Sequence, residues 1–451
     1  MEKIVTPKVV FLILSLATFL IIKNSPSFFP YYLPDSYDYI QIENSFDRNL
    51  FYTFFYIFTQ KTQINLVNTQ ILILSLSISY ITIVFFLINK NKIFTAIIFF
   101  SLAFNIYYTS FSKVILPESI FFSLINVTLG LILVSKENKN LKVFFLFGLC
   151  IGLIAITKKI GIVLAIIFTL YFFYKNKAQN LKFIIILTFS LVIIFENIIF
   201  FKYHDERGSV VPTAILGKFL FISGSESFQS DNYLYLDKFK DEILTIQEKS
   251  RTIHSFLNTI DNRFIRAELQ SDYEVVLQYQ NIFELDNYNE ISTFIKDNHY
   301  KFFFEMIKNN PIQYLEIFFN HYIGMWAGGG KFFPEFYEKL SNESVPYSNY
   351  LKNSSSEMKI TKNSLIMLSH YLFIILFIIF LFVSILSFIR LLINRKFDIV
   401  IFLLIACNLY LCLVAFVNVS TIRYLMPIYP IVNFVILMII NKKVLVRKCV
   451  E

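Results

Sequence analysis

The sequence predicts an all-α polytopic membrane protein with about ten transmembrane helices and a small, mostly helical extracytoplasmic domain. First, 56% of the 451 residues are hydrophobic and 54 of them are Phe, whereas soluble domains are about 45–50% apolar. Second, apolar runs near the length of a spanning helix, about 17–25 residues, recur along the chain between short charged joints. Third, a single long polar segment, 202–365, interrupts this series.

The apolar runs define the expected spanning helices in chain order. They are 6–22, 67–88, 93–110, 119–135, 142–157, 160–174, 183–201, 366–389, 399–417 and 424–440. The first run resembles the apolar region of a signal peptide, but no A-x-A-like cleavage site follows it, so we expect it to be retained. The runs 142–157 and 160–174 are short, and one of them is expected to be tilted, broken or re-entrant.

The joints between the runs differ in charge, and this predicts their sidedness. One set is rich in Lys and Arg and poor in acids, which is typical of cytoplasmic loops, and it includes both termini. The other set is therefore expected outside the cytoplasm: 23–66, 111–118, 158–159, 202–365 and 418–423. Because the basic residues lie mostly in short runs between apolar segments, the net charge of +9 does not indicate a nucleic-acid partner. We expect three parts: 1–201, 202–365 and 366–451.

The polar segment 202–365 contains helical periodicity. Apolar residues recur at three- and four-residue spacing from about 236 to 310, which predicts amphipathic helices. The apolar stretch 210–220 is too short to span and is expected to lie at the membrane interface. Pro311 is expected to begin another helix that runs to Trp326 and ends at the glycines 328–330.

The first outer joint carries an acidic, aromatic turn that we consider the centre of a candidate site. Asp35 is followed by Asp38 and Tyr39, and one helical turn would place the three on one face. A carboxylate there is suited to act as general base towards an acceptor hydroxyl, amine or phosphate oxygen. Asp35 and Asp38 are equally suited to hold a divalent cation, because hard cations prefer oxygen ligands. An ordinary turn built on Pro34 is the alternative without function.

Other charged residues fall on the same predicted side. Glu118 is either a second acid facing Asp35 or a first-turn Glu favoured by the helix dipole. Lys158 and Lys159 lie in a short joint predicted outside the cytoplasm, where the positive-inside rule disfavours Lys. A bound anion would explain them, and so would snorkelling of the two side chains at helix ends. Arg423, the only basic residue of the last outer joint, suits phosphate recognition or anchors the interface beside Tyr424.

The end of the seventh apolar run adds a weaker group of candidates. Glu196 lies within the run near its outer end, where an acid usually faces a cavity or a partner. His204 and Arg207 follow in a charged stretch, which either contacts a headgroup or is simply solvated.

Together these motifs resemble the GT-C superfamily of polytopic glycosyltransferases, in particular the protein O-mannosyltransferases and the bacterial aminoarabinose (lipid A) transferases. The matching elements are Asp35-Ser36-x-x-Tyr39, Pro117-Glu118-Ser119, Thr157-Lys158-Lys159, Asn310-Pro311-x-x-Tyr314 and Arg423-Tyr424-x-x-Pro427-x-x-Pro430. The first-loop pair is Asp-Ser here rather than Asp-Glu, so Asp38 or Glu118 would supply the second carboxylate.

The resemblance implies an inverting transferase with its active site outside the cytoplasm. The membrane that it implies is a bacterial inner (cell) membrane. The donor would be a polyprenyl-phosphate sugar and the acceptor an envelope lipid, glycan or protein. Asp35 would be the base, and Lys158, Lys159 and Arg423 would stabilise the departing phosphate. No cofactor is implied beyond the divalent cation left open above.

Three other classes of protein remain as alternatives at this point. They are a transporter or flippase of lipid-linked glycans, a glycan polymerase or ligase that uses a diphosphate-linked donor, and a membrane scaffold without activity. A transporter predicts charges spread through the spans as a pathway, whereas here the charges cluster on one predicted side.

Overall fold

The computed structural model describes residues 7–45, 47–135, 140–175, 179–209, 211–226, 228, 240–283, 288–332, 363–394, 398–418 and 421–440. Within these ranges all regular structure is helical and no strand occurs, which confirms the all-α class. The chain forms two compact units. Unit 1 comprises 1–208, 379–410 and 426–451, and unit 2 comprises 209–378 and 411–425.

Four of the described helices are long and apolar enough to cross a membrane. They are α3 (Leu66–Asn89), α9 (Gln179–Tyr203), α17 (Asn363–Asn394) and α18 (Ile399–Val417). The expected single helix 93–110 is broken: α4 (Lys92–Ala103) is followed after a bend of 50° by α5 (Ile106–Ser110), and this pair is a fifth candidate span. The count of about ten spans and their sidedness stay predictions.

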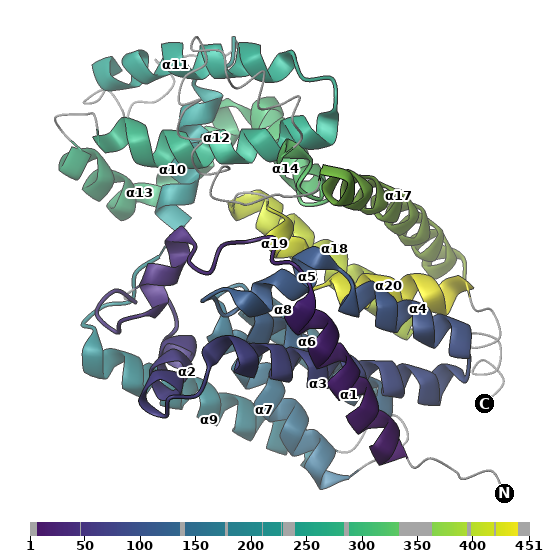
Figure 1. The fold of residues 1–451 in the computed structure, drawn as a ribbon. Helices are drawn as coiled ribbons and strands as arrows, with labels where there is room; N and C mark the ends of the chain where they lie inside the picture. The colour runs from purple at the N-terminus through teal and green to yellow at the C-terminus, as the bar shows by residue number, and fades with distance from the viewer. Residues whose placement is uncertain are drawn as a thin grey trace, which may run out of the picture. The chain divides into compact units, whose positions relative to one another are not determined.

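Shorter apolar helices make up the rest of unit 1. They are α1 (Pro7–Asn24), α6 (Glu118–Val134), α7 (Leu141–Thr157), α8 (Gly161–Lys175) and α20 (Tyr429–Ile440). Helix α3 packs between α1 and α6, and α7 packs against α6, α8 and α9 (Figure 1). Two glycines allow the close approach of α7 to α9. A Cβ on Gly148 would lie 1.8 Å from Thr188 Oγ1, and one on Gly152 would lie 2.8 Å from Val192 Cβ.

The first outer joint contains a helix that the hydropathy pattern did not predict. Helix α2 (Leu50–Lys61) follows the 3₁₀ helix η1 (Pro34–Tyr39) and contacts α7 and α9. Its sequence combines aromatic side chains with Thr and Gln, and it is too short to span.

Unit 2 is built from amphipathic helices around a central apolar one. These are α10 (Val211–Ile222), α11 (Lys240–Asn258), α12 (Arg263–Phe283), α13 (Tyr288–Asn309) and α14 (Pro311–Gly324). The expectation that the stretch 210–220 lies at the membrane interface is wrong. Ile215, Leu216, Phe219 and Leu220 of α10 are buried in the core of unit 2, where α11, α12 and α13 surround the helix (Figure 1).

The helix that begins at Pro311 ends earlier than the sequence suggested. Helix α14 stops at Gly324, so Trp326 lies in the following turn and is fully buried there. Gly328 and Gly329 adopt φ values of 59° and 75°. These values belong to the left-handed region that glycine tolerates best. The glycines thus lie after α14 has ended, and the expectation that they end the helix is wrong.

Candidate functional site

The acidic turn of the first outer joint is a 3₁₀ helix held by its own serine. Ser36 is fully buried and its hydroxyl accepts a hydrogen bond of 2.9 Å from the backbone N–H of Leu33. In a 3₁₀ helix residues three apart eclipse one another, so Asp35 and Asp38 fall on one side. The serine of the Asp-Ser pair thus has a structural role, and the second carboxylate of the turn is Asp38.

Arg48, which lies outside the predicted motif, brings the carboxylates together. Its Nε and Nη2 donate to Asp38 Oδ2 at 3.0 and 2.8 Å. Its Nη2 also lies 3.7 Å from Asp35 Oδ1, and its Nε lies 3.5 Å from Asp47 Oδ1. The guanidinium lies 5.8 Å from the ring centroid of the buried Tyr39. Asp38 therefore receives two hydrogen bonds from Arg48, and Asp35 lies within ion-pair distance of the same guanidinium.

The partial burial of this turn and the charges within it shift the pKa values of Asp38 and Arg48. Although Arg48 acts in the opposite direction, burial raises the pKa of Asp38 above its ordinary value. Burial would lower the pKa of Arg48, but Tyr39 and the neighbouring carboxylates outweigh it and raise that pKa. Arg48 thus stays charged and helps to keep Asp38 charged.

Glu118 and Lys158, predicted for different roles, form an ion pair. Lys158 Nζ donates to Glu118 Oε1 at 2.8 Å, and their side chains are 9% and 0% exposed. Glu118 is the first residue of α6 and Lys158 directly follows the end of α7. The pair therefore joins the ends of two apolar helices, and a carboxylate so deeply buried needs such a partner.

A second pair joins the end of α9 to the first outer joint. Arg207 Nη2 donates to Glu196 Oε2 at 2.8 Å, and its Nη1 donates to Asn49 Oδ1 at 2.7 Å. Asn49 Nδ2 in turn donates to the carbonyl of Ala155 in α7 at 3.3 Å, and Glu196 Oε1 accepts from the backbone N–H of Leu50 at 3.3 Å. The weak candidates Glu196 and Arg207 are thus part of the framework that positions the start of α2.

Lys159 differs from its neighbour Lys158. Its Nζ donates to the carbonyl of Gly208 at 2.6 Å. Burial, assisted by the charges of Arg207 and Arg48, lowers the pKa of Lys159 to about 8, although Asp47 and Glu196 act in the opposite direction. Lys159 is thus joined by a hydrogen bond to Gly208, the residue that follows Arg207 in the chain.

Tyr52 of α2 links the acidic turn to Glu118. Its ring packs edge-on against Tyr39 with centroids 5.4 Å apart, and its hydroxyl donates to Gln70 Oε1 at 2.8 Å. Burial raises the pKa of Tyr52 well above its ordinary value, and Glu118 and Tyr39 add to the shift. Gln70 Nε2 donates to the carbonyl of Val114 at 2.9 Å, shortly before α6 begins. This network fixes the start of α6, and with it Glu118.

An apolar groove of about 550 Å³ lies on unit 1. It is lined by residues of α2, α7 and α9: Phe51, Leu153, Ile156, Leu191, Val192, Ile194, Phe195 and Ile198. Ile156 lies two residues before Lys158, and Phe195 directly precedes Glu196. The same stretches of α7 and α9 therefore carry lining residues of the groove and charged candidates.

The structure places the remaining predicted residues as follows. His204 lies in unit 1, and its ring packs against Phe200 with centroids 4.8 Å apart, whereas the guanidinium of Arg207 lies 3.9 Å from the centroid of the same Phe200 ring. Arg423 and Tyr424 belong to unit 2, in α19 (Ile422–Leu425), where the Tyr424 hydroxyl accepts a hydrogen bond of 2.8 Å from Asn418.

Sequence reasoning missed Arg48, Asn49 and Tyr52. A signal for Arg48 was present, because it is the only Lys or Arg between 24 and 60 in a joint that carries four acids. Asn49 and Tyr52 carried no such signal, since their importance depends on contacts with residues far along the chain.

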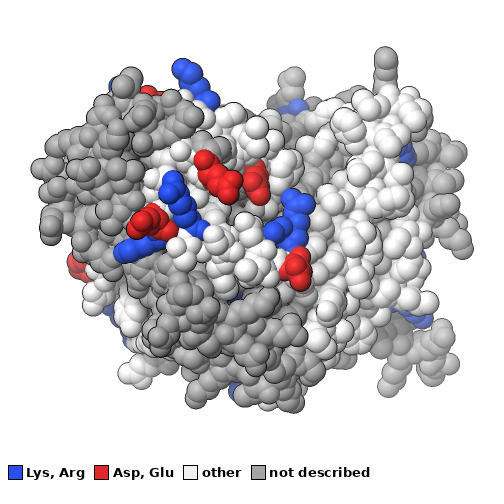
Figure 2. All heavy atoms as spheres, turned by 90° about the horizontal axis from the view of Figure 1, so that it is seen from above, with Lys and Arg blue, Asp and Glu red and all other residues white. Residues whose placement is uncertain are grey.

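Among the described residues, no group of three or more His, Cys, Asp or Glu is arranged to hold a metal ion. The proposed cation at Asp35 and Asp38 remains an open expectation, and Arg48 already supplies positive charge there. On the face drawn in Figure 2, the acidic and basic side chains that are shown lie in small mixed groups.

Comparison of the chain with protein-family models, with curated proteins and with solved structures finds no match. The assignment of a function therefore depends on the site itself.

Proposed function

We propose that the protein is a membrane glycosyltransferase of the GT-C type with its active site outside the cytoplasm. It moves a sugar from a polyprenyl-phosphate donor to an envelope lipid, glycan or protein, with inversion. The observation that carries the proposal is that unit 1 holds two groups of charges, Asp35 with Arg48 and Glu196 with Arg207, together with an apolar groove lined by residues of α2, α7 and α9. Such a combination suits a ligand with a charged head and a long hydrocarbon tail.

The chemistry needs a base and a place for developing negative charge. The acceptor hydroxyl attacks the anomeric carbon of the donor, and its proton passes to the carboxylate of Asp35. The bond from the anomeric carbon to the phosphate oxygen breaks, and polyprenyl phosphate leaves with the electron pair. Cationic donors near that oxygen lower the barrier because they are already oriented when the charge develops.

The contacts suggest how the roles are divided. Asp38 neutralises and orients Arg48. Asp35, 3.7 Å from the same guanidinium, is the base that the resemblance assigns. Lys159 contacts the donor phosphate, while Lys158 is held by Glu118 and supports the same region. Arg423, assigned to the phosphate by resemblance, lies in the other unit, and its role is proposed on that resemblance alone.

The decisive experiment compares envelope lipids, glycans and surface proteins by mass spectrometry in cells with the gene, without it, and with Asp35→Asn restored. The matched control is Glu43→Gln, which removes an exposed carboxylate from the same joint. We expect one defined sugar mass to disappear in the deletion and in Asp35→Asn and to persist with Glu43→Gln. Suppose instead that the deletion strain accumulates a lipid-linked intermediate and that the strain with Asp35→Asn does not. Transport would then be the better interpretation, and the proposal of transfer would be refuted.

A further inference from the structure

Unit 2 contains a polar cavity that has no part in the proposed transfer. Its volume is about 660 Å³, and it lies among α11, α12, α14 and the end of α10. Ligand pockets in proteins are typically about 300–1,000 Å³. The cavity is therefore large enough for a small organic molecule.

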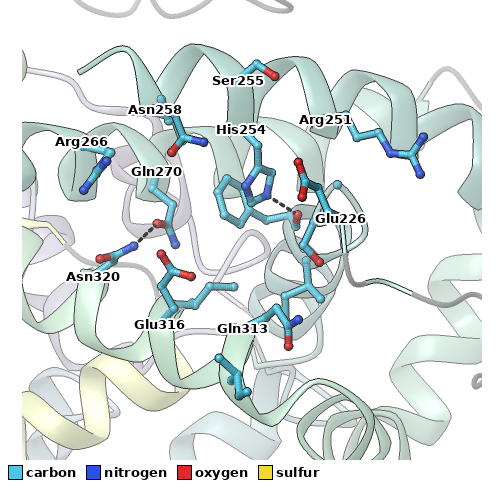
Figure 3. Close-up of a pocket in the computed structure, with 17 residues that line it drawn as sticks. Glu226, Arg251, His254, Ser255, Asn258, Arg266, Gln270, Gln313, Glu316 and Asn320 are labelled. Atoms are coloured by element: carbon cyan, nitrogen blue, oxygen red, sulfur yellow. Dashed lines mark hydrogen bonds between the residues drawn. The ribbon is translucent and has the colours of Figure 1, made fainter. Parts of the chain in front are cut away.

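The walls of this cavity carry donors and acceptors of both signs (Figure 3). Arg251 and Glu226 lie towards one end and Arg266 towards the other, with Glu316 between them. Side-chain amides and two serines are also among the polar lining residues: Ser225, Ser255, Asn258, Gln270, Gln313 and Asn320. Two basic and two acidic residues balance one another, so the cavity favours neither anions nor cations.

The remaining wall is aromatic and apolar. The ring of His254 packs on Phe221 with centroids 4.1 Å apart, and its Nε2 donates to the Phe221 carbonyl at 2.8 Å. Ile222, Leu257 and Ile317 also line the cavity. A ligand that fits must present hydroxyl-like groups of mixed donor and acceptor character together with C–H surface.

A buried ionic network fixes one polar wall. Asn320 Nδ2 donates to Gln270 Oε1 at 2.7 Å, and Gln270 Nε2 donates to Glu274 Oε1 at 2.9 Å. Glu274 also accepts from His321 at 2.8 Å and lies 3.7 Å from Lys218, and all three side chains are fully buried. Burial raises the pKa of Glu274, but His321 and Lys218 outweigh it and keep that pKa below its ordinary value.

The buried network of Glu274, His321 and Lys218 orders the cavity wall. Charged groups are costly to bury, and one well-attested use of buried charged groups is to specify a single arrangement of their neighbours. Here the ordered neighbours are Gln270 and Asn320, whose amides are oriented before any ligand arrives. Preorganised polar groups improve affinity because less ordering is needed on binding.

We propose that this cavity binds a short, uncharged saccharide. Each sugar hydroxyl can both donate and accept a hydrogen bond. It can therefore donate to the carboxylates and amide oxygens of the lining and accept from its amide and guanidinium N–H groups. The C–H face of a sugar ring matches the Phe221 and His254 wall. The inference does not depend on the proposed transfer, because its residues lie in unit 2 and those of the proposed active site in unit 1, Arg423 excepted.

The test uses the full chain purified in detergent and measures saturation-transfer NMR with methyl glucoside, methyl mannoside, methyl galactoside and N-acetylglucosamine. Glu316→Ala removes a charged acceptor from the cavity, and Asn258→Trp fills its space, because the Asn258 side chain points towards Gln270 (Figure 3). Glu248→Ala is the matched control, because Glu248 is an exposed acid on α11 outside the cavity. We expect affinity to fall about tenfold or more in Glu316→Ala and to vanish in Asn258→Trp.

The outcomes separate this inference from the proposed function. Sugar signals that persist in Asp35→Asn and in Glu248→Ala, and that Asn258→Trp removes, support the cavity whatever happens to transfer. No signal from any of the four sugars, or equal signals in Asn258→Trp, overturns the inference. Binding of a sugar acid or a neutral tripeptide in place of the uncharged sugars overturns the assigned class of ligand.

Discussion

The adjacent residues Lys158 and Lys159 allow one change to be made in two different environments. Lys158→Met removes the partner of Glu118, which is fully buried, whereas Lys159→Met removes a cation that donates to a backbone carbonyl. Breaking a buried pair on one side costs about 3–5 kcal/mol, because the other charge stays buried without compensation. We therefore expect Lys158→Met to lower the free energy of unfolding by this amount.

Two matched variants test the cause of that loss. Lys159→Met should change the free energy of unfolding by less than about 1 kcal/mol, since its amine donates to a backbone carbonyl and burial already disfavours its charge. The double variant Glu118→Met/Lys158→Met should recover most of the loss, because apolar residues of similar volume often replace a buried pair at little cost. The assay is reversible unfolding of the purified protein in mixed micelles, followed by circular dichroism.

The result that would refute this reasoning is specific. If Lys158→Met and Lys159→Met cost the same, the pair contributes no more than a surface ion pair, about 0–1 kcal/mol. If the double variant is no more stable than Lys158→Met, the loss comes from packing around the two side chains. The expected coupling between Glu118 and Lys158 would be absent in both cases.

Two further predictions concern the proposed donor. Because the pKa of Lys159 is about 8 and the charged form binds phosphate, the KM for the donor should rise as the pH increases through about 8, and Lys159→Arg should remove that rise. An unchanged profile in Lys159→Arg would contradict this role. Ile198→Trp fills the apolar groove and should raise the KM for a long-chain polyprenyl donor more than for a short-chain one. Ile186→Trp, at an exposed position of the same helix outside the groove, is the control, and equal effects of the two variants would contradict the assignment of the groove to the tail.

Hydropathy predicted most helices of unit 1, because the length and composition of an apolar helix can be read from one continuous stretch of sequence. The bend between α4 and α5 and the helix α2 were missed for a related reason. Asn105 interrupts an otherwise apolar run and caps α5 with its side chain, and α2 is amphipathic and too short to be scored as a span. Such features depend on single side chains rather than on the average of a window.

The burial of α10 illustrates a different limit. An apolar stretch of this length is compatible with a membrane interface and with a domain core. What decided between them was the set of amphipathic helices that follow α10 and cover it. Their own periodicity was readable from the sequence, but the partner of their apolar faces was not.

The candidate residues were chosen by predicted side, and their pairing could not have been derived in that way. Sidedness selected Asp35, Glu118, Lys158 and Lys159, and the expected roles set Glu118 with Asp35 and both lysines with the donor phosphate. The structure pairs Glu118 with Lys158 and places Arg48, which was overlooked, against Asp35 and Asp38. Pairing depends on contacts between residues far apart in the chain, which a single sequence does not contain.

Lys158 and Lys159, which the positive-inside rule disfavours in a loop predicted outside the cytoplasm, have different explanations in the structure. Lys158 is compensated by an acid 40 positions away, so its presence in a loop predicted to lie outside the cytoplasm needs no ligand. Lys159 donates to a carbonyl, and burial lowers its pKa. A cation whose charge the protein itself disfavours gains most from an anionic ligand, because a nearby phosphate would restore its ordinary protonation. Of the two residues, Lys159 is therefore the one whose position a bound phosphate would explain.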